Sequence, residues 1–209
     1  MPEPLLIIAC GALAREIGEL HKLSGWQHVH VKCIDARLHN HPARIPGAIR
    51  QCIDEYRHRY SNIFVAYADC GTAGALDRVL EKEGIERLPG AHCYQFFAGP
   101  EAFERLAEEE PGTFYLTDFL VRNFDRLVIR ALKLDRHPEL LPVLFCNYRR
   151  VVYLAQTRNE ELEASAQKVA DYLGLEYHFV YSGYGGLESG LRQAIRRRDE
   201  REKDNHLLA

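Results

Sequence analysis

Short apolar runs alternate with amphipathic segments along most of this chain, and this alternation is the strongest constraint on its fold. It is typical of α/β proteins, in which helices follow the strands of a parallel sheet. The apolar runs that we expect to be strands cover residues 5–9, 28–34, 63–68, 113–116, 151–155 and 177–181. We therefore predict an open, Rossmann-like, mostly parallel sheet with helices on both faces and a helical middle segment.

The helix expected after the fifth apolar run has the clearest terminal signals. Thr157 and Glu160 have the spacing of a capping box, and Gly174 has the residue type that commonly ends a helix. The apolar positions between them recur with a helical period and are Leu162, Ala166, Val169 and Leu173. The pattern between residues 103 and 142 is also mostly helical, which gives the predicted middle segment.

The length and charge of the chain limit its domain organisation and its partners. The 209 residues are enough for one sizeable core, and no linker rich in Pro, Gly or Ser divides them. We expect a single α/β domain over residues 1–198 and a charged C-terminal tail over 199–209. The net charge of −3 gives no basic field that would attract nucleic acid.

The apolar runs are too short for a membrane protein. None reaches the roughly 18 residues of a membrane span, and the opening MPEPLLIIAC lacks the basic start of a signal peptide. We therefore expect a cytoplasmic protein with no membrane partner. In a reducing compartment, its six cysteines are expected to be thiols, ligands or nucleophiles rather than disulfides.

Two apolar runs end on the dipeptide Cys-Gly, at Cys10-Gly11 and Cys70-Gly71, and lead directly into helical segments. The carboxyl ends of parallel strands face the ligand crevice, so we expect these thiols to lie close together. Glycine lets the backbone turn tightly and approach a ligand. A helix N-terminus favours the thiolate, which binds metals and attacks electrophiles. The alternative is that both cysteines pack as small apolar groups.

A third cysteine, Cys93, follows the turn Pro89-Gly90 and adjoins His92. Neighbouring residues on a strand point to opposite faces, so both can bind one ion only in a turn or a helix start. We predict a metal site of Cys10, Cys70 and Cys93, with His92 or an exogenous ligand in the fourth place. Soft thiolates suit zinc or an iron–sulfur cluster. Three protein ligands and one open position are expected of a reactive centre.

The other cysteines and histidines have a simpler interpretation. Cys33 and Cys52 are interpreted as core or helix-face residues, and Cys146 as a distant reserve ligand. The paired histidines are interpreted as exposed polar residues, at His28, His30, His39 and His41.

Residues 182–190 form a glycine-rich turn between the last predicted strand and a helix. Backbone N–H groups near Gly183 and Gly185 could hold a phosphate or a carboxylate, and a plain loop is the alternative. Thr117-Asp118 follows another apolar run and is most economically a helix cap. The chain lacks the usual hydrolase motifs, so a hydrolase has no anchor in the sequence.

Four blocks of the chain resemble the prokaryotic domain-of-unknown-function family 1638: CGALAREI, YADCGTAG, RLPGAHCYQFFAG and PGTFYLTDF. The resemblance runs in order from about Leu5 to the helix after Gly190. It implies one common site containing Cys10, Cys70, His92 and Cys93. Other members often carry an Asp between the His and the Cys, which are adjacent here.

The resemblance brings no established activity, but it suggests a metabolic setting. Members of this family are often found beside corrinoid-dependent methyltransferase systems that demethylate small methylated amines and betaines. This implies a role in methyl transfer, with a corrinoid as a further candidate cofactor. A corrinoid protein or a methyltransferase subunit is the implied partner.

Three hypotheses follow from these observations. The first is a metal- or cofactor-binding protein with a cysteine-lined site in corrinoid-linked one-carbon metabolism. The second is a metal-free enzyme in which Cys10 or Cys70 is the nucleophile and His92 is its base. The third is a non-catalytic accessory or carrier protein for a methyltransferase system. Metal content separates the first hypothesis from the second.

Overall fold

The structure is a computed structural model that describes residues 3–207. It is an α/β protein with parallel sheets flanked by helices, as predicted, but its strands form two sheets. The chain divides into two compact units. Unit 1 contains the chain up to Cys93 and from Gly186 onward, and unit 2 runs from Tyr94 to Gly185. The single domain expected over residues 1–198 stays a prediction.

Unit 1 is built on a four-stranded parallel sheet with the order β2-β1-β3-β4. Its strands are β1 (Leu5–Cys10), β2 (Val29–Ile34), β3 (Asn62–Ala66) and β4 (Glu86–Arg87). Every residue of β1 is buried, because an interior strand of a parallel sheet is covered on both faces. β2 lies at an edge and is mostly exposed. Cys33 is therefore exposed, and its predicted core position was wrong.

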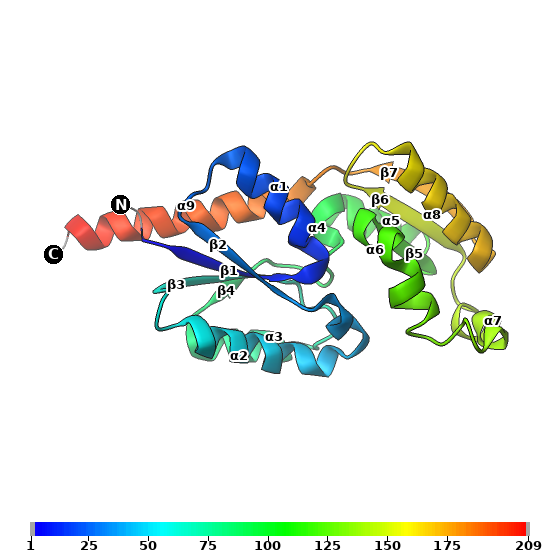
Figure 1. The fold of residues 1–209 in the computed structure, drawn as a ribbon. Helices are drawn as coiled ribbons and strands as arrows, with labels where there is room; N and C mark the ends of the chain where they lie inside the picture. The colour runs from blue at the N-terminus through cyan, green and yellow to red at the C-terminus, as the bar shows by residue number, and fades with distance from the viewer. Residues whose placement is uncertain (1–2, 208–209) are drawn as a thin grey trace. The chain divides into compact units, whose positions relative to one another are not determined.

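Helices cover both faces of the unit 1 sheet. They are η1 (Gly11–Leu13), α1 (Ala14–Ser24), η2 (Ala36–Asn40), η3 (Pro42–Arg44), α2 (Ile45–Tyr56), α3 (Ala75–Glu83) and α9 (Gly185–Leu207). Figure 1 shows α1 and α9 on one face of the sheet and α2 and α3 on the other. Both faces are apolar: Ile17 of α1 and Leu191 of α9 are buried on one side, and Ile49 of α2 and Leu76 of α3 on the other.

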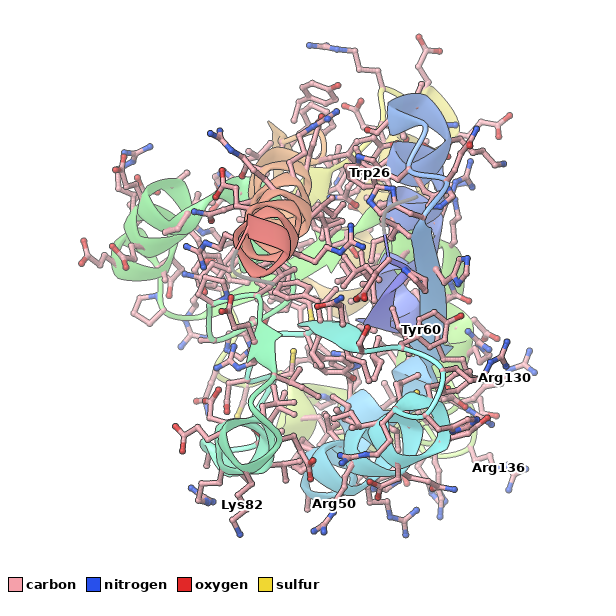
Figure 2. The ribbon with its side chains drawn as sticks, turned by 90° about the vertical axis from the view of Figure 1, so that its left-hand side faces the viewer. Trp26, Arg50, Tyr60, Lys82, Arg130 and Arg136 are labelled. Atoms are coloured by element: carbon pink, nitrogen blue, oxygen red, sulfur yellow. The ribbon has the colours of Figure 1, made fainter. Side chains whose placement is uncertain are left out.

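The long helix α9 packs closely against the rest of unit 1. The Arg192 guanidinium lies 5.5 Å from the ring centre of Trp26, labelled in Figure 2, and donates to the Ser24 hydroxyl at 3.0 Å. The charged tail expected at 199–209 continues this helix as far as Leu207. The side chains at 199 and 201–207, and residues 208–209, lie outside the described part.

Unit 2 is built on a three-stranded parallel sheet with the order β5-β6-β7. Its strands are β5 (Thr113–Thr117), β6 (Arg150–Ala155) and β7 (Glu176–Tyr181). Its helices are α4 (Gln95–Ala98), α5 (Pro100–Glu109), α6 (Asp118–Phe124), the π-helical turn η4 (Asp125–Ile129), η5 (Pro138–Leu140), α7 (Leu141–Leu144) and α8 (Glu160–Leu173). The core lies between β6, buried throughout, and the apolar faces of α6 and α8.

The start of α8 differs from the prediction, whereas its end agrees. The Asn159 side chain caps the helix by accepting from the Leu162 N–H at 2.9 Å. The predicted capping box at Thr157 was therefore wrong, because the Thr157 hydroxyl donates to Asp118 Oδ2 at 2.5 Å instead. Gly174 ends the helix in the left-handed conformation, with φ of 69°.

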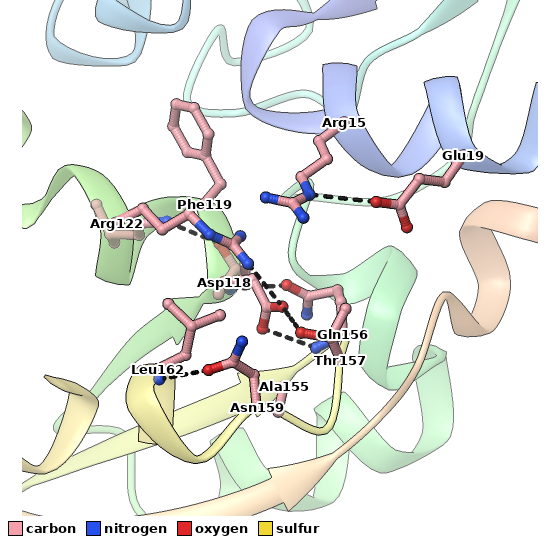
Figure 3. Close-up of polar contacts among 12 residues, drawn as sticks. Arg15, Glu19, Asp118, Phe119, Arg122, Ala155, Gln156, Thr157, Asn159 and Leu162 are labelled. Atoms are coloured by element: carbon pink, nitrogen blue, oxygen red, sulfur yellow. Dashed lines mark hydrogen bonds and ion pairs between the residues drawn. The ribbon is translucent and has the colours of Figure 1, made fainter. Parts of the chain in front are cut away.

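Asp118 links β5 to the end of β6 within unit 2, as Figure 3 shows. Its carboxylate accepts hydrogen bonds from the Tyr153 hydroxyl at 2.7 Å and from the Gln156 N–H at 2.9 Å. Arg122 lies 3.7 Å from Oδ2. Thr117 caps α6 by accepting from the Leu120 N–H, as predicted. Asp118 is fully buried with its oxygens satisfied, so its contacts are those of a structural linker.

Within residues 3–207, no helix combines the length and the apolar character that a membrane crossing demands.

Candidate metal centre

Each of the four parallel strands of unit 1 is followed by one member of a compact group of sulfur and imidazole side chains. Cys10 is the last residue of β1, and His39 lies in η2 after β2. Cys70 follows β3, and Cys93 follows β4. The carboxyl ends of parallel strands lie at one edge of a sheet, which explains why residues so distant in sequence meet. We refer to these four residues as the cysteine–histidine cluster.

The cluster has the dimensions of a coordination shell for a single ion. Cys70 Sγ and Cys93 Sγ are 3.2 Å apart, and both ring nitrogens of His39 lie 3.9 Å from Cys10 Sγ. One ligand atom from each of Cys10, His39 and Cys93 lies within 4.8 Å of the others. Zinc–ligand bonds are roughly 2.0–2.3 Å long, so small side-chain movements would bring these donor atoms around one thiophilic ion.

The backbone after β1 positions and polarises Cys10. The side chain of Cys10 is fully buried, and its sulfur accepts a hydrogen bond from the Ala12 N–H at 3.3 Å. Gly11 allows this turn, because a Cβ there would come within 2.7 Å of the Ile34 carbonyl oxygen. The glycine that was predicted to approach a ligand thus has a packing role between β1 and the end of β2.

Cys70 is held in a backbone conformation that side chains other than glycine rarely adopt. Its φ is +47°, which costs about 1–3 kcal/mol and persists only where the surroundings impose it. The Cys70 N–H donates to the Ala91 carbonyl at 2.8 Å, and the Asp69 N–H donates to that of Gly90 at 3.0 Å. These bonds tie the loop after β3 to the loop after β4. They consequently place Cys70 next to Cys93.

The carboxylate of Asp69 organises the same loop from its other side. It accepts hydrogen bonds from the Thr72 hydroxyl at 2.6 Å, the Gly74 N–H at 2.8 Å and the Ala73 N–H at 3.1 Å. Gly71 has a φ of +83°. Asp69 does not belong to the cluster, but it fixes the turn on which Cys70 stands.

His39 is oriented by a carbonyl group and by an aromatic ring. Its Nδ1 lies 3.0 Å from the Ala36 carbonyl oxygen, and its ring stacks on Tyr67 with a centroid separation of 5.6 Å. In a neutral imidazole, donation from Nδ1–H to a carbonyl leaves Nε2 as the ligand atom. His39 therefore has the outer hydrogen bond that is usual for a metal-binding histidine.

Without a metal, the side chains of the cluster shift one another's pKa values. The pKa of Cys70 is lowered to about 5, and that of Cys10 lies well below its usual range, although burial acts in the opposite direction. The causes are hydrogen bonding with Cys93 and the nearby His39. The same two thiolates raise the pKa of Cys93. Burial lowers the pKa of His39, but the thiolates outweigh it and raise the value to about 11. These shifts favour the thiolate forms of Cys10 and Cys70 and the protonated form of His39.

Tyr67 brings a buried hydroxyl to the cluster. Its side chain is fully buried, and among the described residues its oxygen has no hydrogen-bond partner of ordinary geometry. Burial, the charges of Cys10 and Cys93, a hydrogen-bond interaction with Cys10 and the charge of Cys70 raise its pKa. Buried polar groups nearly always have partners, so an orphaned hydroxyl beside a donor set indicates a place for a further group.

The structure brings together all three cysteines predicted to share the site, but with a different histidine. In the described part of the chain, the group able to hold an ion consists of Cys10, His39 and Cys93, and neither Cys70 nor His92 is a member. His39 had been interpreted as an exposed loop residue. The sequence feature that could have pointed to His39 was its position, because His39 follows its strand much as Cys70 follows β3. The ligand and catalytic roles of Cys10, Cys70, Cys93 and His92 stay predictions.

The remaining sequence candidates have structural environments of their own. Gly183 and Gly185 belong to unit 2, where the N–H of Gly183 donates to the Ala155 carbonyl at 3.1 Å. A Cβ at Gly185 would collide with the carbonyl of Phe97. Backbone packing thus accounts for both glycines, and a ligand-binding role for them stays a prediction. Cys146 is exposed in unit 2, and Cys52 is buried in α2.

The fold and the cluster define an α/β protein with a soft-donor site at the carboxyl edge of a parallel sheet. The chain belongs to the family described as "Protein of unknown function (DUF1638)", which matches residues 33–191. This range includes His39, Cys70 and Cys93, and it confirms the resemblance found in the sequence. No curated protein and no solved structure matches the chain.

Proposed function

We propose that the cysteine–histidine cluster binds one thiophilic metal ion, with zinc as the first candidate. The observation that carries this proposal is the convergence of Cys10, His39 and Cys93 within 4.8 Å. Two sulfurs and one imidazole nitrogen form a soft donor set that suits zinc or iron. The small spread of the donors favours a single ion over an iron–sulfur cluster, which was the other candidate.

In this proposal, Cys70 occupies an exchangeable fourth position. Its sulfur lies 3.2 Å from that of Cys93, but Cys70 does not belong to the group of three donors, which leaves the fourth position to an outside ligand when Cys70 is displaced. The orphaned Tyr67 hydroxyl would then donate a hydrogen bond to the group that replaces Cys70. Three protein ligands and one exchangeable position are the arrangement of a reactive metal centre rather than a purely structural one.

The reaction class that we propose is methyl transfer to a metal-bound thiolate. Metal coordination keeps a thiol deprotonated and nucleophilic near neutral pH. The sulfur of this thiolate would form a bond to the methyl carbon. At the same time, the bond between that carbon and the methyl donor would break, and its electron pair would leave with the donor. The resemblance to proteins found beside corrinoid-dependent systems suggests a methylated corrinoid as donor. A corrinoid protein or a methyltransferase subunit would be the partner, and the cytoplasm the compartment.

Metal analysis of protein purified without oxygen tests this function. We expect about one zinc or iron ion per chain and no acid-labile sulfide. Cys10→Ser, Cys93→Ser and His39→Ala should each abolish stoichiometric binding, whereas Cys70→Ser should only weaken it. Cys33→Ser and His92→Ala are matched controls outside the donor group and should keep the metal. Absence of metal from the unaltered protein, or equal loss in the controls, would contradict the proposal.

A metal-free thiol nucleophile is the second candidate, favoured by the 3.9 Å separation of Cys10 and His39. His39 would act as the base, in place of the predicted His92. In that case one cluster cysteine should alkylate much faster than Cys33 in metal-free protein, and His39→Ala should remove the difference. A protein that holds metal but shows no turnover with methyl donors and thiols would instead favour the accessory role.

A further inference from the structure

We propose that Cys70 and Cys93 form a reversible disulfide and that this oxidation releases the metal from the cluster. The inference rests on the proposed function, because it concerns the regulation of the same site. It is carried by a separate observation, the direct contact between the two sulfur atoms. The cluster would then be both a metal centre and a site of oxidative modification.

The geometry already brings the two thiols close to bonding distance. Their Sγ atoms are 3.2 Å apart, and a disulfide requires about 2.0 Å. The two loops are joined by the bonds from the Asp69 and Cys70 N–H groups to the Gly90 and Ala91 carbonyls. A side-chain movement of about 1 Å could therefore close the bond while the backbone connections stay in place.

The chemistry assigns different roles to the two sulfurs. Cys70 as a thiolate attacks one oxygen of hydrogen peroxide, the O–O bond breaks, and hydroxide leaves to become water. The Cys93 thiolate would then leave the metal and attack the sulfenic sulfur, the S–S bond would form, and the sulfenic hydroxyl would leave as hydroxide, which takes a proton from the solvent. The two sulfurs lose two electrons in total, and the peroxide gains them. A dithiol reductant reverses the reaction.

Oxidation would break up the metal site because Cys93 belongs to the donor group. A sulfur within a disulfide no longer binds as a thiolate, so only Cys10 and His39 would remain of the three donors. Cys10 is less open to oxidation than Cys70, since its sulfur is fully buried and accepts the Ala12 N–H. Loss of Cys93, together with Cys70 in the fourth position, would therefore empty the site and leave Cys10 reduced.

Peptide mapping and zinc release test the inference together. Trypsin separates the two cysteines, with Cys70 in residues 60–78 and Cys93 in residues 88–105. Peroxide treatment of the zinc-loaded protein should link these peptides, with a mass loss of two hydrogens, and release one zinc per link. Dithiothreitol and added zinc should restore the loaded protein. Cys33→Ser should behave like the unaltered protein.

The variants keep the two proposals distinguishable. Cys70→Ser, loaded at saturating zinc, should retain its metal at peroxide concentrations that empty the unaltered protein. Zinc release at the same peroxide concentration from this variant, or a link to Cys10 in place of Cys70, would overturn the disulfide switch. If the unaltered protein binds no metal, the proposed function fails, and mapping of the metal-free protein still shows whether peroxide joins Cys70 to Cys93.

Discussion

The hydroxyl of Tyr153 donates a hydrogen bond of 2.7 Å to the carboxylate of Asp118, and thereby joins β6 to the start of α6. Both residues are buried, so water does not compete for this hydrogen bond. Burial and Asp118 together raise the pKa of Tyr153, so that its hydroxyl remains a donor. The same carboxylate also binds the first residues after β6, which makes it the main polar connection in unit 2.

Replacement of Asp118 by Ala should therefore destabilise the protein strongly. It would leave the Tyr153 hydroxyl, the Gln156 N–H and the Thr157 hydroxyl without their acceptor, at a total cost of about 3–5 kcal/mol. Urea denaturation measures the change in the free energy of unfolding. Asp125→Ala is the control, because its exposed ion pair with Arg130 contributes at most about 1 kcal/mol. Equal losses of stability in the two variants would show that the hydrogen bonds of Asp118 contribute little to the free energy of unfolding.

Replacement of Asp69 by Ala should weaken metal binding although Asp69 is not a ligand. Loss of its three hydrogen bonds frees the turn that holds Cys70, and outer-sphere changes of this kind typically cost 10–100-fold in affinity. Competition with a chromophoric zinc chelator gives the affinity. Asp69→Asn keeps one carbonyl acceptor and should recover part of the loss. Asp54→Ala on the exposed face of α2 should change nothing, and a similar loss there would contradict this role.

Replacement of Tyr67 by Phe should leave the metal-free protein as stable as before or more stable by about 1 kcal/mol. Among the described residues, the buried hydroxyl that it removes has no hydrogen-bond partner of ordinary geometry. Tyr60→Phe makes the same change where the hydroxyl lies 2.6 Å from His30 Nδ1, and it should cost about 0.5–1.5 kcal/mol. Thermal unfolding shows whether each of the two substitutions raises or lowers the stability of the protein. Tyr60 is labelled in Figure 2. A clear destabilisation by Tyr67→Phe would mean that its hydroxyl is already satisfied.

Replacement of Gly11 by Ala should destabilise unit 1 by about 1–3 kcal/mol. Its Cβ would meet the Ile34 carbonyl oxygen at 2.7 Å, and backbone atoms cannot move aside as a flexible side chain does. Gly18→Ala is the matched control, since no atom lies within 4 Å of a Cβ there and the helical position should gain about 0.5–1 kcal/mol. The denaturation midpoints of the two variants measure these changes in stability. A neutral Gly11→Ala would remove the packing explanation for this glycine.

Much of the fold could be predicted from local patterns. All six predicted apolar runs are strands. They could be recognised because the alternation of short apolar and amphipathic segments depends only on neighbouring residues. The two-residue strand β4 is too short to produce such a pattern. The division into two sheets depends on pairing between distant strands, which local periodicity does not contain. Asn159 rather than Thr157 caps α8, because a buried carboxylate from another element takes the Thr157 hydroxyl.

The candidate site was predictable where a cysteine stands at the end of a strand or soon after it. Cys10 ends β1 and Cys70 lies in the loop that follows β3, and parallel strands bring such positions together. His39 could not be found from residue type, since a polar histidine in a loop usually faces solvent. Only the pairing of β2 with β1 brings its loop over Cys10. The choice of His39 over His92 is therefore a consequence of sheet topology.

The distribution of the cluster over four strand ends also bears on how the protein would acquire the proposed metal. In a compact zinc knuckle the ligands are neighbours in sequence, so a short peptide can capture the ion before folding. Here Cys10 and Cys93 are separated by most of unit 1, and closing so long a loop in a disordered chain is entropically unfavourable. The proposed ion would therefore bind tightly only after all four strands have aligned. Metal uptake would thus be a late event in biogenesis, and occupancy would distinguish correctly assembled molecules from incomplete ones.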